Sequence, residues 1–177
     1  MNTDNRLTYD LTKIRAFVFD VDGVLSPSTI PMGPDGVPCR MANIKDGYAL
    51  QLAIKQGYKI AIITGGISDA VKNRYNALGI SDVFMGSAMK LPILRQWMAD
   101  NNLDSGNTVY VGDDIPDYEC MREVKLSVAP ADAASEILSI ASYVSMANGG
   151  HGVARDIIER VMKAQKKWMS TEKAFGW

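Results

Sequence analysis

The sequence FVFDVDGVL (residues 17–25) places two carboxylates, Asp20 and Asp22, within a run of otherwise apolar residues. The apolar residues have the composition of a buried β-strand. Because burying an unpaired carboxylate costs several kcal/mol or more, the aspartates are expected at the end of the strand, in a polar site. That site must contain a cation or a proton to share their charge, and the rest of the sequence indicates which.

Length and composition predict a single domain. The chain has 177 residues, of which 47% are hydrophobic, enough for a sizeable core. Its net charge of −1 gives no indication of a nucleic acid or an anionic membrane as partner. No apolar stretch approaches the roughly 20 residues of a membrane helix, and the polar first residues are unlike a signal peptide. We therefore expect a cytoplasmic protein, in which Cys39 and Cys120 fit no metal-ligand spacing and are free thiols.

Short apolar runs rich in β-branched residues alternate with helical patterns along the chain. This alternation predicts an α/β fold, a three-layer Rossmann-like parallel sheet with helices on both faces. The last helix is expected to place Ile157, Val161 and Trp168 on one face. The expected strands are 14–21, 58–65, 107–114 and 126–130, with weaker candidates at 81–86 and 142–146, and the expected helices are 46–57, 68–79, 90–100 and about 152–169.

One segment inside the domain, about residues 25–45, has no helical period. It consists of two extended stretches around Gly-Pro-Asp-Gly (33–36), a strong turn signal, and we expect a projecting β-hairpin. An exposed hairpin rich in Ile, Met, Val and Pro is either an aggregation hazard or a partner surface, and we favour the partner surface.

The main domain is expected over residues 14–166, between an N-terminal arm (1–13) and a C-terminal tail (167–177). The tail either reaches the site of a neighbouring subunit or stays free. Between Asp20 and Thr64 the chain has room only for the hairpin, one helix and one strand, and between Thr64 and Lys90 only for one helix and one strand. We therefore expect no inserted cap domain over the site.

Polar residues stand at several predicted strand ends, where an open parallel sheet binds its ligands. Converging carboxylates cannot all ionise without a cation, and hard oxygen ligands suit Mg²⁺. A hydroxyl, glycine N–H groups and a lysine make a receptor for a phosphate, and a nearby carboxylate could act as a nucleophile. The residues concerned are Asp20 and Asp22, Thr64, Gly65 and Gly66, Lys90, and Gly112, Asp113, Asp114 and Asp117.

Lys90 stands at the start of a predicted helix, where the helix dipole disfavours a cation. We therefore expect an anionic group to compensate its charge.

At these residues the chain resembles the haloacid dehalogenase (HAD) superfamily of phosphatases. The motifs DVDGV (20–24), IITG (62–65), Lys90 and GDDIPD (112–117) occur in the superfamily's order. The resemblance implies that Asp20 is the nucleophile and forms an aspartyl-phosphate. It implies that Asp22 is the general acid and base, and that its backbone carbonyl is a metal ligand.

The same resemblance assigns roles to the remaining motif residues. Thr64 and the Gly65 amide would hold the phosphoryl oxygens, and Lys90 would neutralise Asp20 and the phosphate. The metal ligands would be Asp20, Asp22 and Asp113, with Asp114 binding the metal directly or through water and Asp117 orienting these groups and the helix start.

Further segments resemble the capless 3-deoxy-D-manno-octulosonate 8-phosphate (KDO 8-phosphate) phosphatase family, namely NIKDGYAL (43–50), NRYNALGI (73–80) and GGHGVARD (149–156). This resemblance implies a homotetramer whose hairpins pack together. It implies as substrate a small phosphorylated sugar acid, KDO 8-phosphate or a related keto-sugar-acid phosphate, in lipopolysaccharide precursor synthesis. Arg74 matches the family and becomes a candidate substrate contact.

The chain departs from the family pattern at several positions. Gly66 and His151 stand where the family usually carries arginines, which removes two cations that could meet a substrate carboxylate. Met89 replaces the usual Asp, and Ser-Pro-Ser (26–28) replaces Thr-Asp-Gly. The alternative function is a non-catalytic or broad-specificity subunit of the same fold that binds a sugar phosphate or a partner enzyme.

Overall fold

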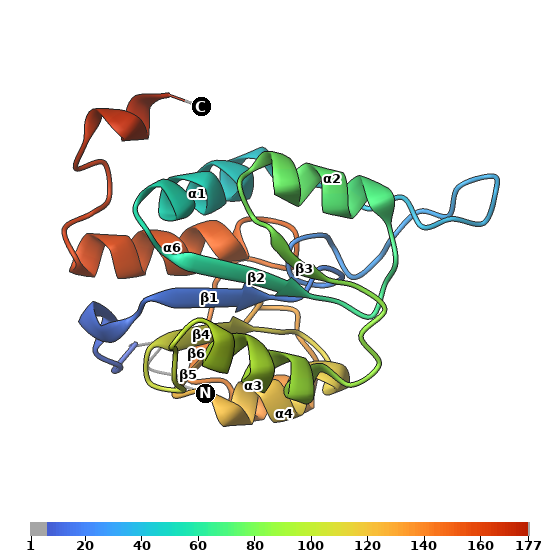
Figure 1. Ribbon diagram of the computed structural model, residues 1–177. Coiled ribbons are helices and arrows are strands. Elements are labelled where there is room, and N and C mark those ends of the chain that lie inside the picture. Colours follow the sequence, from blue (N-terminus) through green and yellow to red (C-terminus); the bar gives the residue numbers. More distant parts are fainter. Residues whose placement is uncertain (1–6, 177) are drawn as a thin grey trace.

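The computed structural model describes residues 7–176, which form one six-stranded sheet covered by helices on both faces (Figure 1). The strand order is β3-β2-β1-β4-β5-β6, and every neighbouring pair is parallel. The predicted α/β class is therefore confirmed, including both weaker strand candidates. The strands are β1 (Ala16–Phe19), β2 (Lys59–Ile63), β3 (Asp82–Phe84), β4 (Thr108–Val111), β5 (Leu126–Ala129) and β6 (Tyr143–Val144).

The helices form two layers around this sheet. Three of them share one core with one face of the sheet, and three share a second core with the other face. The short helices α4 and α5 and the 3₁₀ turns were not predicted. The first layer contains α1 (Ile44–Lys55), α2 (Asp69–Ala77) and α6 (Val153–Ala164), and the second α3 (Lys90–Asp100), α4 (Tyr118–Glu123) and α5 (Ser135–Ile140). The 3₁₀ turns are η1 (Leu11–Lys13), η2 (Ile115–Asp117) and η3 (Glu172–Phe175).

Strand β1 is buried on both faces, which explains its uninterrupted apolar sequence. Successive side chains of a strand point to opposite faces. Accordingly Phe17 and Phe19 pack into the core under α1, α2 and α6, whereas Ala16 and Val18 pack under α3, α4 and α5.

The register of the central strands brings their polar ends together. Phe19 of β1 lies opposite Ile62 of β2 on one side and Val111 of β4 on the other. The chain order reverses at β1, because β2 and β4 leave from its two sides, and such a reversal opens a crevice at the carboxyl ends. The residues that follow these three strands are those in the sequence motifs.

The predicted extent of the last helix is wrong at its end. Helix α6 stops at Ala164, and Lys166 adopts a left-handed φ of 57°, which turns the chain out of the helix. Trp168 is therefore not on the helix, although it packs against the same core. Its ring lies edge-on to Tyr48 at 6.1 Å and under the Arg155 guanidinium at 4.6 Å.

Residues 25–45 project beyond the carboxyl ends of the strands as a narrow hairpin (light blue in Figure 1). Its arms are joined by hydrogen bonds from Gly33 N to Val37 O and from Cys39 N to Pro31 O, both 2.8 Å. Only one bridge pair forms, Met32 with Pro38, since prolines cannot donate to a longer ladder. The predicted hairpin is therefore present, but with almost no regular strand.

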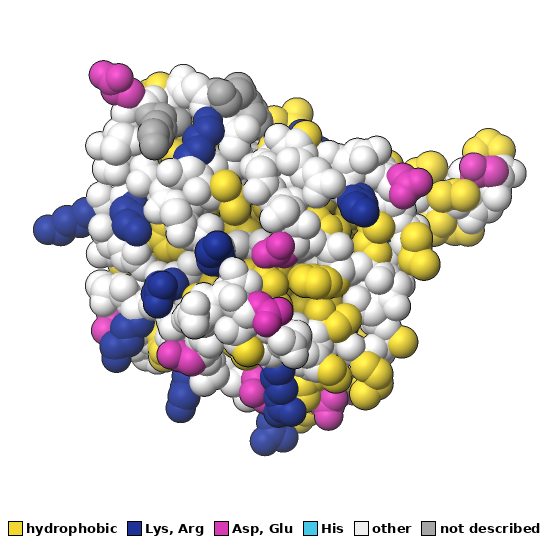
Figure 2. Space-filling model, viewed as in Figure 1, with side chains coloured by type: hydrophobic (Ala, Val, Ile, Leu, Met, Phe, Trp, Pro, Cys, Tyr) yellow, Lys and Arg dark blue, Asp and Glu magenta, His cyan; other side chains and the backbone are white. Residues whose placement is uncertain are grey.

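Apolar side chains of the hairpin are open to solvent in the single chain. Met32 is 67% and Val37 51% exposed, and apolar atoms cover much of the projection in Figure 2. Met41 and Ile44 at its base are exposed as well. This is the apolar surface that the sequence predicted.

The end of the chain packs at the opposite end of the sheet from the hairpin (Figure 1). Tyr48 donates a hydrogen bond to the Ala174 carbonyl, and Gln56 Nε2 donates to Thr171 Oγ1 at 3.2 Å. The part of the tail that the structure describes thus lies on α1 of its own chain, and Trp177 lies outside the described residues. Among residues 7–176, no helix has the length and apolar character needed to cross a membrane.

Candidate active site

A buried lysine joins two carboxylates at the carboxyl end of β1. Lys90 is 5% exposed, and its Nζ lies 2.8 Å from Asp20 Oδ2 and 2.8 Å from Asp117 Oδ1. Burial by itself would lower the pKa of Lys90, but the charges of Asp117 and Asp20 outweigh this and raise it. The anionic compensation expected for a lysine at a helix start is therefore confirmed, and it comes from two different loops.

Asp117 is the most buried member of this group, with 0% exposure. Its Oδ1 also accepts a hydrogen bond from the Tyr110 hydroxyl at 2.7 Å, and its Oδ2 accepts one from Asp113 N at 3.1 Å. A side chain at Gly112 would collide with Asp117, since a Cβ there would lie 2.4 Å from the Asp117 Cβ. Because both oxygens of Asp117 already have protein donors, its main effect is to position Lys90 and the start of the Asp113 loop.

Asp113 faces Asp20 across the site and has one oxygen without a protein partner. Its Oδ1 is buried and accepts no hydrogen bond from the described residues. The other side of the carboxylate touches Gly23, where an added Cβ would lie 1.9 Å from Asp113 Oδ2. Gly23 also has a φ of 87°, so both the turn after β1 and the approach of Asp113 require glycine.

The carboxylates of this cluster disfavour one another's charge. Burial, followed by the charge of Asp117, raises the pKa of Asp20 to about 7 and that of Asp113 to about 8. The charge of the exposed Asp114 raises the pKa of Asp113 as well, by a smaller amount. One oxygen each of Asp20, Asp113 and Asp117 lie within 4.8 Å of one another. Clustered carboxylates with an unpartnered buried oxygen fit a divalent cation with hard oxygen ligands, such as Mg²⁺.

Thr64 and Gly65 follow β2 beside Asp20, as predicted. Thr64 is buried, and its Oγ1 accepts a hydrogen bond from Gly66 N at 3.2 Å, which leaves the hydroxyl proton free to be donated. Gly65 is exposed, and a Cβ added there would meet only the Ser87 carbonyl oxygen, at 4.0 Å. Since Phe19 pairs with Ile62, Thr64 and Gly65 leave β2 at the same edge of the sheet as Asp20 and its partner Lys90. A hydroxyl, a backbone N–H and an ammonium at one edge can form a receptor for tetrahedral oxyanions.

Asp22 carries a partner that sequence reasoning missed. Arg40 Nε lies 2.7 Å from Asp22 Oδ1 and Nη2 lies 2.8 Å from Asp22 Oδ2, a bidentate pair. Arg40 comes from the returning arm of the hairpin, whose backbone is fastened by the bond from Met41 N to Ser26 Oγ at 3.1 Å. An arginine in an irregular, exposed segment gives no sequence signal for such a contact.

A cavity of about 290 Å³ lies beside Arg40, between the base of the hairpin and α2. Arg74 lines it together with apolar side chains that include Val71 and Tyr75. A Cβ at Gly47 would lie 2.5 Å from Arg74 Nη2, so that glycine lets Arg74 fold against α1. The candidate substrate residue Arg74 thus shares a cavity with Arg40.

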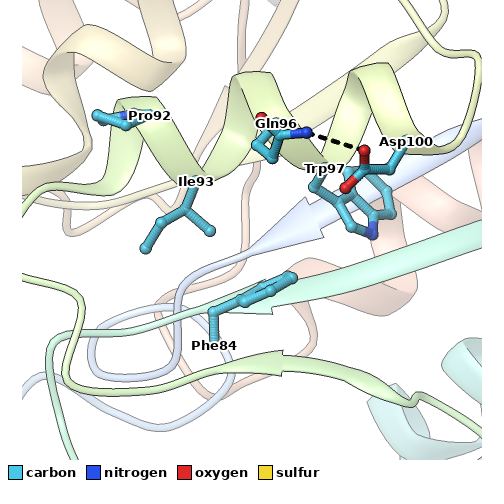
Figure 3. A pocket seen from close by; sticks show the side chains of 6 residues that line it. All are labelled: Phe84, Pro92, Ile93, Gln96, Trp97 and Asp100. Carbon is cyan, nitrogen blue, oxygen red and sulfur yellow. Dashed lines mark hydrogen bonds between the residues drawn. The ribbon is translucent and has the colours of Figure 1, made fainter.

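A second cavity of about 290 Å³ lies at the sheet edge, between β3 and α3, away from these polar groups. Figure 3 shows Ile93 and Trp97 extending from α3 toward Phe84 of β3. Gln96 donates to Asp100 at 2.8 Å within it. None of the predicted site residues lines this cavity, so it has no part in the site described above.

Comparisons with known proteins agree with this geometry. Residues 79–157 match the family described as haloacid dehalogenase-like hydrolase. The curated 3-deoxy-D-manno-octulosonate 8-phosphate phosphatases of Yersinia pestis and Escherichia coli K12 are 36% and 37% identical to this chain. Each alignment spans 87% of this chain and 82% of the relative. The chain belongs to the KDO 8-phosphate phosphatase family.

Solved structures of KDO 8-phosphate phosphatases have the same fold. The Yersinia pestis enzyme gives a TM-score of 0.86 at 35% identity, covering 93% of this chain and 88% of that one. The Moraxella catarrhalis enzyme, solved in complex with magnesium, phosphate and KDO, gives a TM-score of 0.89 at 29% identity. That alignment covers 98% of this chain and 99% of the Moraxella chain. The chain is therefore a phosphatase of the HAD superfamily, as its motifs predicted.

Two departures from the KDO 8-phosphate phosphatase pattern have structural counterparts. The Arg40 guanidinium fills the space beside Gly66, where a Cβ would lie 2.4 Å from Arg40 Nη2. His151 bonds within its own loop, Nδ1 to the Gly149 carbonyl at 2.7 Å. That loop supports the turn after β1, because a Cβ at Gly149 would lie 2.1 Å from the Gly23 carbonyl oxygen.

Asp20, Lys90 and Asp117 form a buried ion triad, which predicts a large loss of stability for Lys90→Met. This change leaves Asp20 and Asp117 buried without their cation, and we expect the free energy of unfolding to fall by about 3–5 kcal/mol. The double variant Lys90→Met/Asp117→Asn should recover much of the loss, since it removes one of the two uncompensated charges. Urea unfolding in the presence of EDTA measures both values.

The matched control is Arg95→Met, which breaks the exposed pair of Arg95 with Glu123 (2.8 Å) and should cost less than about 1 kcal/mol. An equally small loss for Lys90→Met, or no recovery in the double variant, would show that the buried triad is not a stability determinant.

Proposed function

We propose that this protein is a Mg²⁺-dependent phosphomonoester hydrolase that acts on KDO 8-phosphate or a closely related keto-sugar-acid phosphate. The observation that carries the proposal is Asp20 in contact with the Lys90 ammonium, with the unpartnered Asp113 oxygen opposite and Thr64 at the end of the neighbouring strand. The relative from Moraxella catarrhalis, solved with magnesium, phosphate and KDO, supports the ligand set.

In the proposed reaction an Asp20 oxygen attacks phosphorus and the ester P–O bond breaks, which leaves an aspartyl-phosphate. Asp22 in its acid form gives its proton to the leaving oxygen, then takes a proton from the water that hydrolyses the intermediate. Inorganic phosphate leaves and the Asp20 carboxylate is regenerated. Lys90, Thr64 and the Gly65 amide bind the phosphoryl oxygens throughout, so positioning and electrostatics supply most of the rate.

Mg²⁺ would be held by Asp20, Asp113 and the backbone carbonyl of Asp22, and it would neutralise charge on the phosphoryl group. Asp117 orients Lys90 and the Asp113 loop, and Asp114 lies at the exposed margin of the same loop. Arg74 is the candidate contact for the sugar-acid part of the substrate, because it lines the cavity next to Asp22's partner Arg40.

The biological setting follows from the family. We place the reaction in lipopolysaccharide precursor synthesis, and the cytoplasmic location expected from the sequence stays a prediction. The division into an arm (1–13), a phosphatase domain (14–166) and a tail (167–177) is likewise a proposal. The alternative, a non-catalytic subunit that binds a sugar phosphate or a partner enzyme, has no need of the complete set of Asp20, Asp22, Thr64 and Lys90.

Phosphate release from a panel of phosphate esters tests the proposed function. With Mg²⁺ we expect one eight- or nine-carbon keto-acid phosphate to be strongly preferred over neutral sugar phosphates. Asp20→Asn should abolish turnover, because the amide cannot attack phosphorus. Weak and even activity across the panel would overturn the substrate assignment, whereas no hydrolysis of any ester would favour the binding subunit.

Binding of Mg²⁺ can be measured without turnover. Millimolar Mg²⁺ should raise the thermal unfolding temperature of the wild type, because a ligand that binds only the folded state stabilises it. Asp113→Asn should remove most of this shift, since Asp113 holds the unpartnered oxygen. The control is Asp114→Asn at the neighbouring exposed position, which should keep most of the shift; equal behaviour of the two variants would contradict the proposed ligand set.

We also propose that the hairpin joins the subunits of a homotetramer. Its exposed apolar residues Met32 and Val37 would be covered in that assembly. Light scattering should give a tetramer mass for the wild type and a lower mass for the Met32→Asp/Val37→Asp variant. The control is Met146→Asp, at an 86% exposed methionine outside the hairpin, which should stay tetrameric. A monomeric wild type, or a tetrameric hairpin variant, would overturn this assignment.

A further inference from the structure

The proposed acid and base, Asp22, has both carboxylate oxygens engaged by a single guanidinium. The two bonds from Arg40, 2.7 and 2.8 Å long, have the parallel geometry of the strongest arginine–carboxylate pairs. A carboxyl group held in this way is turned toward the hairpin and is not free to reach the leaving oxygen of an ester. Catalysis by Asp22 therefore requires that Arg40 be drawn away.

The Arg40–Asp22 pair fits into space that is left open because residue 66 is a glycine. Gly66 does not have a positive φ, so its backbone conformation does not require a glycine. The close approach of Arg40 does require one, because Arg40 Nη2 would lie 2.4 Å from an added Cβ. Because the obstructed atom is the end of a flexible side chain, a substituent here would displace the guanidinium and leave the fold intact.

Arg40 also faces a space that could receive it. It lines the cavity of about 290 Å³ that contains Arg74, and apolar side chains such as Val71 make up much of the rest. A substrate held by its phosphoryl group at Thr64 and Lys90 could extend toward this cavity. An anionic group there would approach Arg40, which is already charge-paired with Asp22, and the side chain of Arg74.

We propose that Arg40 is the specificity-determining residue of this phosphatase, exchanging Asp22 for the carboxylate of the substrate. The two N–H···O bonds to Asp22 break as bonds to the substrate carboxylate form. As the guanidinium leaves, Asp22 takes up a proton from solvent water, which makes it the acid that the reaction requires, and it is free to turn toward the leaving oxygen. A phosphate ester without a second anion leaves Arg40 on Asp22, and it is hydrolysed slowly for that reason.

This inference rests on the proposed function and is tested with two substrates, KDO 8-phosphate and glucose 6-phosphate. In Arg40→Gln we expect kcat/KM for KDO 8-phosphate to fall roughly tenfold to hundredfold, as for a lost charged hydrogen bond. The same variant should hydrolyse glucose 6-phosphate faster than the wild type does, since Asp22 is released. Opposite changes in the activity on the two substrates would support the exchange, because a merely structural role of Arg40 would lower both activities.

Gly66→Ala provides a second variant that keeps Arg40 in the chain. Its added methyl group should push the guanidinium off Asp22 and shift selectivity in the same direction as Arg40→Gln. The matched control is Arg95→Gln, which breaks a surface ion pair between α3 and α4 and should leave the selectivity ratio unchanged. Thermal unfolding of each variant shows whether a change in activity reflects lost folding.

The outcomes separate this inference from the proposed function. If the wild type hydrolyses KDO 8-phosphate and both variants lose the two activities in parallel, Arg40 only positions Asp22 and the exchange is wrong. If the variants lose neither activity, Arg40 has no role in the reaction. If the wild type hydrolyses no phosphate ester with Mg²⁺, the proposed function itself fails and the exchange fails with it.

Discussion

The pairing of one buried lysine with two aspartates is the constraint on which this site depends. Lys90 opens α3, Asp20 follows β1 and Asp117 ends η2, so three separate segments must meet within hydrogen-bond distance. None of the three charges could be buried alone at acceptable cost. The sheet makes the meeting possible because β1 and β4 are adjacent and end at the same level, and α3 shares a core with both strands.

Glycines set how closely the segments around this triad can approach. Gly23 lets the Asp113 carboxylate touch the turn after β1, and Gly112 lets Asp117 fold back over β4. Gly149 brings the loop before α6 against the same turn. At each of these positions a Cβ would collide with another segment, so the geometry of the site is maintained by backbone packing as well as by its charges.

The sequence was sufficient to predict the sheet, the main helices and most of the residues that gather at the carboxyl ends of the central strands, because those features depend on local patterns. Strand β1 is an apolar run, α2 begins at a Ser cap, and Lys90 opposes a helix dipole that demands an anion. Contacts made by irregular segments could not be predicted. Arg40 reaches Asp22 from a hairpin without strand periodicity, and the helix end at Ala164 depends on a turn at Lys166 that apolar spacing does not reveal.

The charge balance of the site explains why its carboxylates, its two cationic side chains and a divalent cation form one functional unit. Four carboxylates face two cationic side chains, which leaves an excess of two negative charges when all are ionised. A divalent cation cancels that excess, which bears on carboxylates whose pKa values are already raised, first by burial and then by the charge of Asp117. An incoming phosphate dianion restores the imbalance, and a carboxylate on the same substrate adds to it. Of the two cations, Lys90 is locked between buried aspartates whereas Arg40 is held by Asp22 alone, so Arg40 is the one that can respond to the new charge.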